Sequence, residues 1–497
     1  MAVVTPLIDE SKVIESFGVT APLSLACATP RDEAETRAML AYLESVAPAE
    51  SAEGWRTRWE ALVDLEQKVC DWLVSECSVD PITDDVHAVG KVLTFGSFRL
   101  GVIRPSSDID TLVLIPSSVS RDFFFTDFIS RVLSSDPEVT ECVPVTDARV
   151  PIAKLKYRGI YFDILVASVP ASEITIAMDC VDESLIYKVD EKCMKSMNGI
   201  RVAEKILTLV PDPATFRQAT RLVKYWAQQR GIYSNSVGFF GGVSWSMAVA
   251  RVCQLFPNFS AKQIVERFFY TFSNWPWEDN RPIMLCHPSR SSQQHHQFKD
   301  WNPTRYASDR NQVMPVVTPI FPSHNTTYNV TETQKQIMIS ELKRGKEIMQ
   351  LMALDNIGWH SLCVPLPFFS LYNTFIELSV SAQSPEELAK FKGLVESRIR
   401  SLVRCIEMLD KKVIARPNPE FFPKSDSGSF YIGITVEDPE IGQIDLAPAL
   451  TQFINETMDK SVAEWIVSEG IEVQNIRLEI RLETRNSVEE NWSKLDR

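Results

Sequence analysis

The chain has 497 residues, of which 45% are hydrophobic and 23% charged, a globular composition with room for about two or three domains. Its formal net charge of −14 argues against a protein that coats nucleic acid along its whole surface, but it leaves room for a local basic groove that holds a strand end. No apolar run has the length of a membrane span, the first residues do not look like a signal peptide, and the ten cysteines include no Cys-x-x-Cys pair, so we expect free thiols in a reducing compartment.

Two helices are predicted before the first strand. Asp32–Glu44 and Trp55–Cys77 follow helical periodicity, and the second has a broad apolar face. We expect both helices to cover one face of the sheet that the next segments form.

A pair of acids follows a small-residue turn at residues 96–97. Ten residues separate Ser97 from Asp108, and Asp110 leads into the apolar run Leu112–Ile115, which is typical of a buried strand. Side chains two apart on a strand point the same way, so the two aspartates would project together and repel each other unless a cation lies between them. An Asp-x-Asp alone is usually a solvated turn, but the whole pattern favours a divalent metal.

A third acid, Asp163, lies in the apolar run of residues 158–167, which predicts another strand. Residues 149–157 also predict a strand and residues 121–133 a helix, so we expect a mixed sheet with helices packed against it. A lone carboxylate in an apolar strand is costly unless it is paired or bound to a metal. Together with the first pair, it would complete a three-carboxylate site for two metal ions, which suits in-line attack of a hydroxyl on a nucleoside triphosphate.

Helices dominate from about residue 190. The helix predicted over residues 216–230 has a buried apolar stripe, and a second face carries polar residues at helical spacing, namely Arg217, Arg221, Lys224 and Gln228. Such a polar stripe is usually solvated. Gly241 and Gly242 precede another predicted helix, where the backbone can approach a phosphate, although this signal alone is weak.

Residues 275–330 are rich in Pro, Asn, Ser and Trp and predict a long connector between helices. We do not expect a zinc site in it, because no usual structural motif fits the spacing of Cys286, His287, His295 and His296.

The last third of the chain predicts a small ferredoxin-like α+β domain. Strands over residues 371–380, 430–436 and 476–482 alternate with a helix that begins after Ser384 and another over residues 446–467. An aromatic RNP1 signature is absent, so contact with nucleic acid would be electrostatic. The basic residues available for it, for which an exposed solubilising loop is the alternative, are Lys411, Lys412, Arg416 and Lys424.

Taken together, the motifs resemble one family. The sequence is similar to the eukaryotic nuclear poly(A) polymerases, within the nucleotidyltransferase superfamily that includes DNA polymerase beta, strongly over residues 16–345 and weakly beyond. The stretches that carry this resemblance are Phe95–Val102, Asp108–Leu112, Ile232–Asn235, Gly241–Trp245 and Asn325–Val330.

The resemblance implies an α+β fold in three domains. A nucleotidyltransferase (polymerase beta-like) catalytic domain, with a mixed sheet and helices, is expected over residues 20–190. A helical central domain is expected over residues 1–19 and 191–350, and a ferredoxin-like, RRM-like RNA-binding domain over residues 351–497.

It also implies an activity. The family members are template-independent polynucleotide adenylyltransferases, which add AMP from ATP to the 3′-hydroxyl of RNA in mRNA polyadenylation. Two Mg²⁺ or Mn²⁺ ions are the implied cofactors. The implied partners are ATP, the RNA 3′ end and mRNA 3′-end processing factors, with no membrane, and we expect a monomer in the nucleus.

The family's residue roles carry over to matching positions. Asp108 and Asp110 would hold both metals, and Asp163 the metal that lowers the pKa of the attacking hydroxyl. The residues expected to contact ATP are Phe95, Gly96 and Ser97 at the triphosphate turn, Asn198 at the ribose, Lys224, Tyr233, Asn235 and Gly242 near the phosphates, and Val150 and Val243 beside the adenine.

Arg149 departs from the family pattern, which usually has an aromatic residue here, near the incoming base. A related enzyme that adds uridylate or CCA is therefore an alternative, and base contact is expected from Val150. A different class is a non-catalytic RNA-binding scaffold with an inactive polymerase domain. Its signature would be a lost carboxylate, and all three are present.

Overall fold

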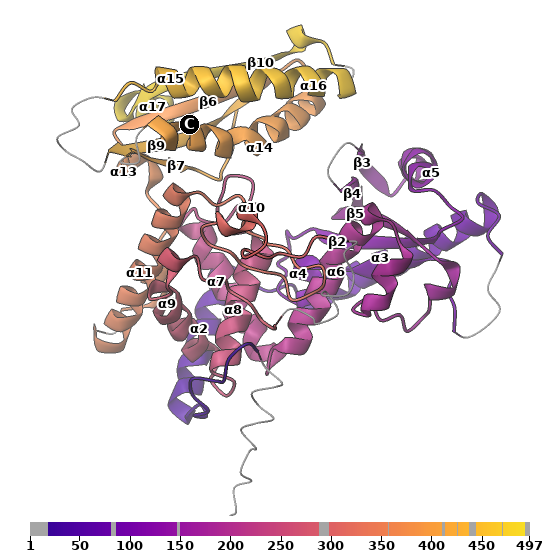
Figure 1. The fold of residues 1–497 in the computed structure, drawn as a ribbon, viewed down its shortest axis with the longest axis horizontal. Coiled ribbons are helices and arrows are strands. Elements are labelled where there is room, and N and C mark those ends of the chain that lie inside the picture. The colour runs from indigo at the N-terminus through magenta and orange to yellow at the C-terminus, as the bar shows by residue number, and fades with distance from the viewer. Residues whose placement is uncertain are drawn as a thin grey trace, which may run out of the picture.

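The computed structural model describes residues 18–80, 86–146, 150–287, 298–355, 357–409, 413–424, 426–436, 444–469 and 471–492, with elements labelled as in Figure 1. A mixed sheet lies at one side of the molecule, a group of helices in the middle, and a second sheet with its own long helices above them (Figure 1). The predicted α+β fold is therefore confirmed. None of the described helices is both long enough and apolar enough to cross a bilayer.

The first sheet has the order β1-β2-β5-β4-β3. β2 and β5 are parallel neighbours, and the other pairs are antiparallel. Its strands are β1 Lys91–Thr94, β2 Ile109–Pro116, β3 Val139–Val145, β4 Ile152–Tyr157 and β5 Ile160–Val169. The apolar run of β2 is buried along almost its whole length, as its composition predicts, and the parallel register sets Asp110 directly opposite Asp163.

Helix α3 (Ala52–Ser75) covers one face of this sheet together with a π-helical segment, Phe124–Val132. The expectation that α2 (Pro30–Val46) lies there too is wrong. Its buried residues Met39 and Leu43 belong to the core of the middle helices, and Glu35 pairs with Lys262 of α9 at 2.8 Å. An apolar stripe predicts that one face of a helix is buried, but it does not predict which element that face packs against.

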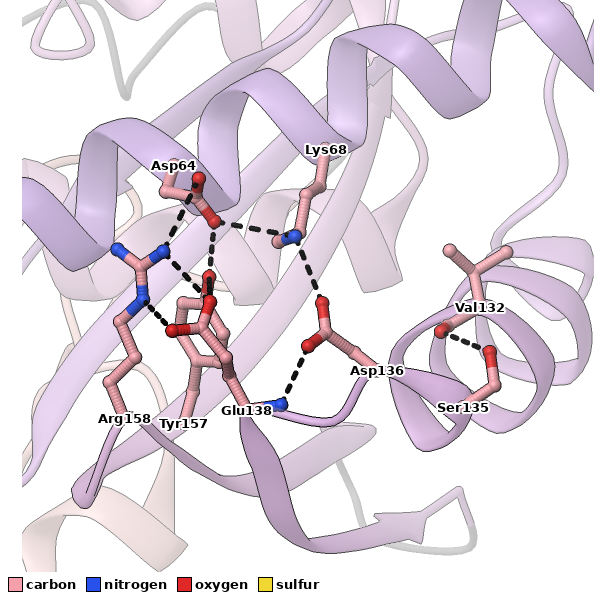
Figure 2. A network of polar contacts seen from close by, with 8 residues as sticks. All are labelled: Asp64, Lys68, Val132, Ser135, Asp136, Glu138, Tyr157 and Arg158. Carbon is pink, nitrogen blue, oxygen red and sulfur yellow. Dashed lines mark hydrogen bonds and ion pairs between the residues drawn. The ribbon is translucent and has the colours of Figure 1, made fainter.

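The turn between β4 and β5 is tied to α3 by a polar network (Figure 2). Arg158 and Gly159 both have positive φ angles, as a two-residue hairpin turn of this twist requires. Arg158 donates to Glu138 at 2.8 Å, and the hydroxyl of Tyr157 donates to Asp64 of α3. This network holds the hairpin that carries Asp163 against the covering helix.

The middle of the molecule is a helical domain. Its main helices are α6 Glu191–Leu209, α7 Pro213–Gln229, α8 Gly242–Leu255, α9 Ala261–Ser273 and α11 Glu332–Asp355. The apolar stripe predicted on α7 is buried, with Trp226 fully enclosed. Short helices are α4 Gly96–Leu100, α5 Arg121–Phe123, α10 Ala307–Arg310, α12 Trp359–Leu362, α13 Phe368–Leu371 and α17 Arg485–Trp492.

The C-terminal sheet has the order β10-β6-β9-β7, with β8 paired to β9, and all its pairs are antiparallel. Its strands are β6 Thr374–Ala382, β7 Val413–Pro417, β8 Phe422–Pro423, β9 Ser427–Val436 and β10 Ile476–Thr484, and its helices are α14 Pro385–Leu409, α15 Ala447–Gln452 and α16 Asp459–Glu469. This βαββαβ order is the predicted ferredoxin-like arrangement.

The expectation that Arg416 contacts RNA is wrong. This residue is only 7% exposed, and its guanidinium donates to the carbonyl of Arg230 at 2.7 Å. Lys424 is exposed, and Lys411 and Lys412 lie outside the described residues.

Candidate active site

A cavity of about 1710 Å³ opens between the first sheet, the middle helices and α14 of the C-terminal domain. Almost every residue predicted from the sequence lines it. These are Phe95, Gly96, Ser97, Asp108, Asp110, Val150, Asp163, Asn198, Lys224, Tyr233, Gly242 and Val243. Asn235 is not among the lining residues; its carbonyl accepts a hydrogen bond from Asn329 at 3.1 Å.

Two of the three aspartates are neighbours on β2 and β5, and the third comes directly before β2. Asp110 and Asp163 are register partners, and Asp108 is exposed just before β2. Burial raises the pKa of Asp110 to about 7, and the charges of Asp108 and Asp163 act in the same direction. Burial also raises the pKa of Asp163, against the opposing charge of Lys154. A cation would relieve this repulsion.

Gly96 makes the space that Asp110 occupies. Its φ of +59° is in the left-handed region, and a Cβ there would stand 1.9 Å from Oδ2 of Asp110. The turn after β1 can therefore approach the carboxylate only with glycine at this position. The backbone N–H of Phe95 also donates to the carbonyl of Asp110 at 3.0 Å, which fixes the turn beside β2.

The donor set suits a divalent metal that keeps open positions. In the described part of the chain, no group of three or more His, Cys, Asp or Glu side chains is arranged to hold a metal ion. Mg²⁺ is ordinarily bound by one or two carboxylates, with water and substrate phosphates completing its octahedron. Asp110 and Asp163, which face each other across β2 and β5, fit that pattern, and the exposed Asp108 adds a third negative charge close enough to act on Asp110.

Lys224 of α7 and Tyr233 line the same cavity, next to the start of α8, and the charge of Lys224 acts on Asp110. The Lys224 ammonium is 6.0 Å from the centre of the Tyr233 ring, and a Cβ on Gly242 would stand 2.6 Å from the Tyr233 hydroxyl oxygen. Burial lowers the pKa of Lys224 to about 8, helped by the charge of Arg104. Burial raises the pKa of Tyr233 to about 12, so its hydroxyl stays a hydrogen-bond donor at neutral pH.

The remaining predicted residues are placed as follows. Asn198 lies on α6, where its side-chain oxygen is 3.4 Å from a guanidinium nitrogen of Arg201. Val243 lies in the first turn of α8 and is partly exposed to the cavity. Arg149, His295 and His296 are outside the described residues, and Cys286 hydrogen-bonds the carbonyl of Pro319.

Comparison with known proteins gives matches along most of the chain. Three family models match in succession: the poly(A) polymerase nucleotidyltransferase domain over residues 18–210, the central domain over residues 215–365, and the predicted RNA binding domain over residues 367–428. Poly(A) polymerase PAPalpha of Candida albicans is 38% identical over 81% of this chain and 72% of its own length. Poly(A) polymerase pla1 of Schizosaccharomyces pombe is 37% identical over 82% and 72%.

The chain belongs to the poly(A) polymerase family. Nuclear poly(A) polymerase 1 of Arabidopsis thaliana is also 36% identical over 93% of the chain, but the match spans only 65% of that relative's length. For nuclear poly(A) polymerase 2 of the same plant, the match spans 56% of the relative. A solved structure of the RNA terminal uridylyl transferase Cid1 covers 68% of this chain and 99% of its own, with 16% identity and a TM-score of 0.45.

Two arginines of this family member that the sequence analysis did not name also belong to the site. Arg104 lines the cavity, and its guanidinium donates to Gln228 at 2.9 Å. Arg58 of α3 is buried and donates to the carbonyls of Pro105 and Ser107, each at 2.8 Å, so it holds the turn that delivers Asp108. A signal existed for Arg104, which is the nearest cation before the Asp-x-Asp in the sequence, whereas nothing local marks Arg58.

Proposed function

We propose that this chain is a template-independent polynucleotide adenylyltransferase, which transfers AMP from ATP to the 3′-hydroxyl of RNA. The observation that carries the proposal is that one cavity of this family member is lined both by the β2–β5 carboxylates and by Lys224 and Tyr233. Carboxylates and a buried cation in one cavity are the two halves of a site for an attacking hydroxyl and a triphosphate.

On the carboxylate wall, Asp108 and Asp110 would bind two divalent ions, and Asp163 one of them. When bound, such ions would lower the pKa of the RNA hydroxyl and offset the charge of the triphosphate. The protein residues hold the geometry: the β2–β5 register fixes Asp110 against Asp163, and Gly96 admits the triphosphate turn to the same place.

Lys224 and Tyr233, which line the same cavity, would orient the phosphates. A buried ammonium interacts more strongly with a phosphate than a solvated one does, because little water screens it. Its lowered pKa would return toward the ordinary value when the triphosphate binds. Ser97 would add a hydroxyl donor from the turn, Asn198 would bind the ribose, and Val150 with Val243 would flank the adenine.

Beyond the site, we propose that the RNA-binding domain holds the RNA 3′ end over the cavity that α14 helps to line. The names of the relatives support a nuclear place of action, and mRNA 3′-end processing factors are the proposed protein partners. A monomer is the proposed active form, with Mg²⁺ or Mn²⁺ as the metal.

Primer extension tests the proposal. A labelled oligo(A) RNA is incubated with each of the four NTPs in turn, with Mg²⁺ and with Mn²⁺, beside Asp110→Ala. We expect a ladder with ATP alone that is absent from the variant. A ladder with UTP or CTP instead would move the specificity to the uridylate- or CCA-adding alternative, and no ladder with any NTP would favour the scaffold.

A further inference from the structure

The sheet face that lines the cavity carries two rows of side chains. In the first row, Asp163 of β5 pairs with Lys154 of β4, which pairs with Val143 of β3. In the second row, Tyr161 pairs with Lys156, which pairs with Glu141. Positions two apart share a face, so both rows face the cavity side, about 7 Å apart along the strands.

Tyr161 is an exposed aromatic ring held in a fixed place. It is 46% exposed and lines the cavity, whereas Tyr157 on the same hairpin is 1% exposed. The Lys156 ammonium is 4.8 Å from the centre of the Tyr161 ring, and the tyrosine hydroxyl donates to Glu141 at 3.3 Å. Because Lys156 holds the ring at its face and Glu141 holds its hydroxyl, a flat partner could stack on the ring with little further loss of side-chain entropy.

The position of this ring separates it from the place proposed for ATP. Val150 comes before β4, whereas Lys156, the register partner of Tyr161, lies near the end of that strand. Along the strand, Val150 and Lys156 are therefore about 14 Å apart or more. Lys154 and Asp163 lie between them. The ATP base would thus lie at one end of the strand, the carboxylates in the middle and Tyr161 at the other end.

We propose that Tyr161 is a stacking platform for the base of the 3′-terminal RNA nucleotide. This inference rests on the proposed function, since the RNA hydroxyl must reach Asp163, two residues along the same strand. Base–aromatic stacking accepts any base, because every base has a flat π surface. The Lys156 ammonium lies over the ring and also pairs with Glu141 at 3.3 Å, and Lys154, whose charge acts on Asp163, adds a second cation from the neighbouring row for the phosphates of a strand end.

The test compares intact oligo(A) with an oligomer whose 3′-terminal nucleotide lacks its base. For the unmodified protein, loss of the base should raise KM for the RNA about 5- to 150-fold, the range expected from one base–aromatic stack. Tyr161→Ala should show a similar rise on intact RNA and no longer distinguish the two oligomers. Tyr161→Phe keeps the ring and should behave like the unmodified protein, and KM for ATP should stay within about twofold in all variants.

Tyr270→Ala is the matched control, because Tyr270 is 51% exposed on α9 and is not among the residues that line the cavity. Fluorescence anisotropy of the two oligomers without ATP gives a second readout that needs no turnover. The platform is refuted if Tyr161→Ala binds and extends intact RNA normally, or still distinguishes the abasic oligomer. If the unmodified protein makes no ladder at all, the proposed function fails, and the anisotropy comparison still decides whether Tyr161 stacks on the RNA.

Discussion

The guanidinium of Arg104 adds a second positive charge to the Lys224 side of the cavity. It is held by Gln228, one helical turn along α7 from Lys224, and its charge helps to lower the Lys224 pKa. Two cations held close together in a partly buried place destabilise each other unless an anion joins them. The triphosphate is the anion that the proposed function supplies.

Arg104→Met should therefore raise KM for ATP about 10-fold, the effect of one charge-assisted hydrogen bond of about 1.5 kcal/mol, while KM for RNA changes little. Steady-state kinetics with ATP varied at saturating RNA measures it. Arg305→Met, at a surface arginine outside the cavity, serves as the control. An unchanged KM for ATP would remove Arg104 from the triphosphate site.

For single residues, the sequence predicts those whose positions follow from the regular alternation of side chains along a strand. Asp108, Asp110 and Asp163 could be placed together because strand side chains alternate with a fixed period and apolar runs mark buried strands. Arg58 could not be found that way. Its partners are backbone carbonyls 47 and 49 residues further along the chain, and backbone atoms leave no trace in residue type.

Among the elements, the clearest misses have physical causes. Strand β3 was not predicted, since it is an edge strand with Pro144 inside it and mixes polar with apolar residues. The segment after Arg121 was expected to be one helix, yet only Arg121–Phe123 is α-helical and the next nine residues form a π-helix. Helix α2 was found but assigned to the wrong neighbour, because tertiary packing decides where an amphipathic helix docks.

The network that ties α3 to the first sheet should make stability depend on pH (Figure 2). Although burial raises it, the pKa of Asp64 is held below its ordinary value by the hydroxyl of Tyr157 and the charges of Lys68 and Arg158. Asp136 likewise keeps a lowered pKa despite its burial, through Lys68 at 2.9 Å. Between the lowered pKa values of the folded protein and the ordinary Asp pKa, the unfolded chain binds more protons than the folded one. The stabilisation from these two aspartates is therefore present above the ordinary Asp pKa and lost as pH falls.

Lys68→Met should flatten this dependence. We expect the variant to be less stable than the unmodified protein at pH 7, with the difference shrinking between about pH 5 and pH 3, because both aspartates then titrate nearer their ordinary pKa. Urea unfolding across that range measures it, with Lys460→Met, at an exposed lysine of α16, as the control. A constant difference across the range would show that Lys68 does not depress these pKa values.

Across the whole molecule, the C-terminal domain is attached to the middle helices through buried charges. Glu341 of α11 pairs with Arg230, which follows α7, at 2.8 Å and with Arg416 of β7 at 3.3 Å, and all three side chains are less than 10% exposed. A second contact joins Glu396 of α14 to Ser236, which stands in the loop after Tyr233, at 2.6 Å. The domain that lines one side of the cavity is thus held in place by polar contacts that no sequence periodicity reveals.

Removing Glu341 should loosen this attachment. Glu341→Ala leaves two buried guanidinium groups without their carboxylate, so we expect a loss of about 3–5 kcal/mol in the free energy of unfolding, measured by urea denaturation. Glu386→Ala is the matched control, since Glu386 pairs with Lys390 on the exposed start of α14 and should change stability by less than about 1 kcal/mol. Equal losses for the two variants would mean that the buried cluster adds no more to stability than a surface pair, and that other contacts fix the C-terminal domain over the cavity.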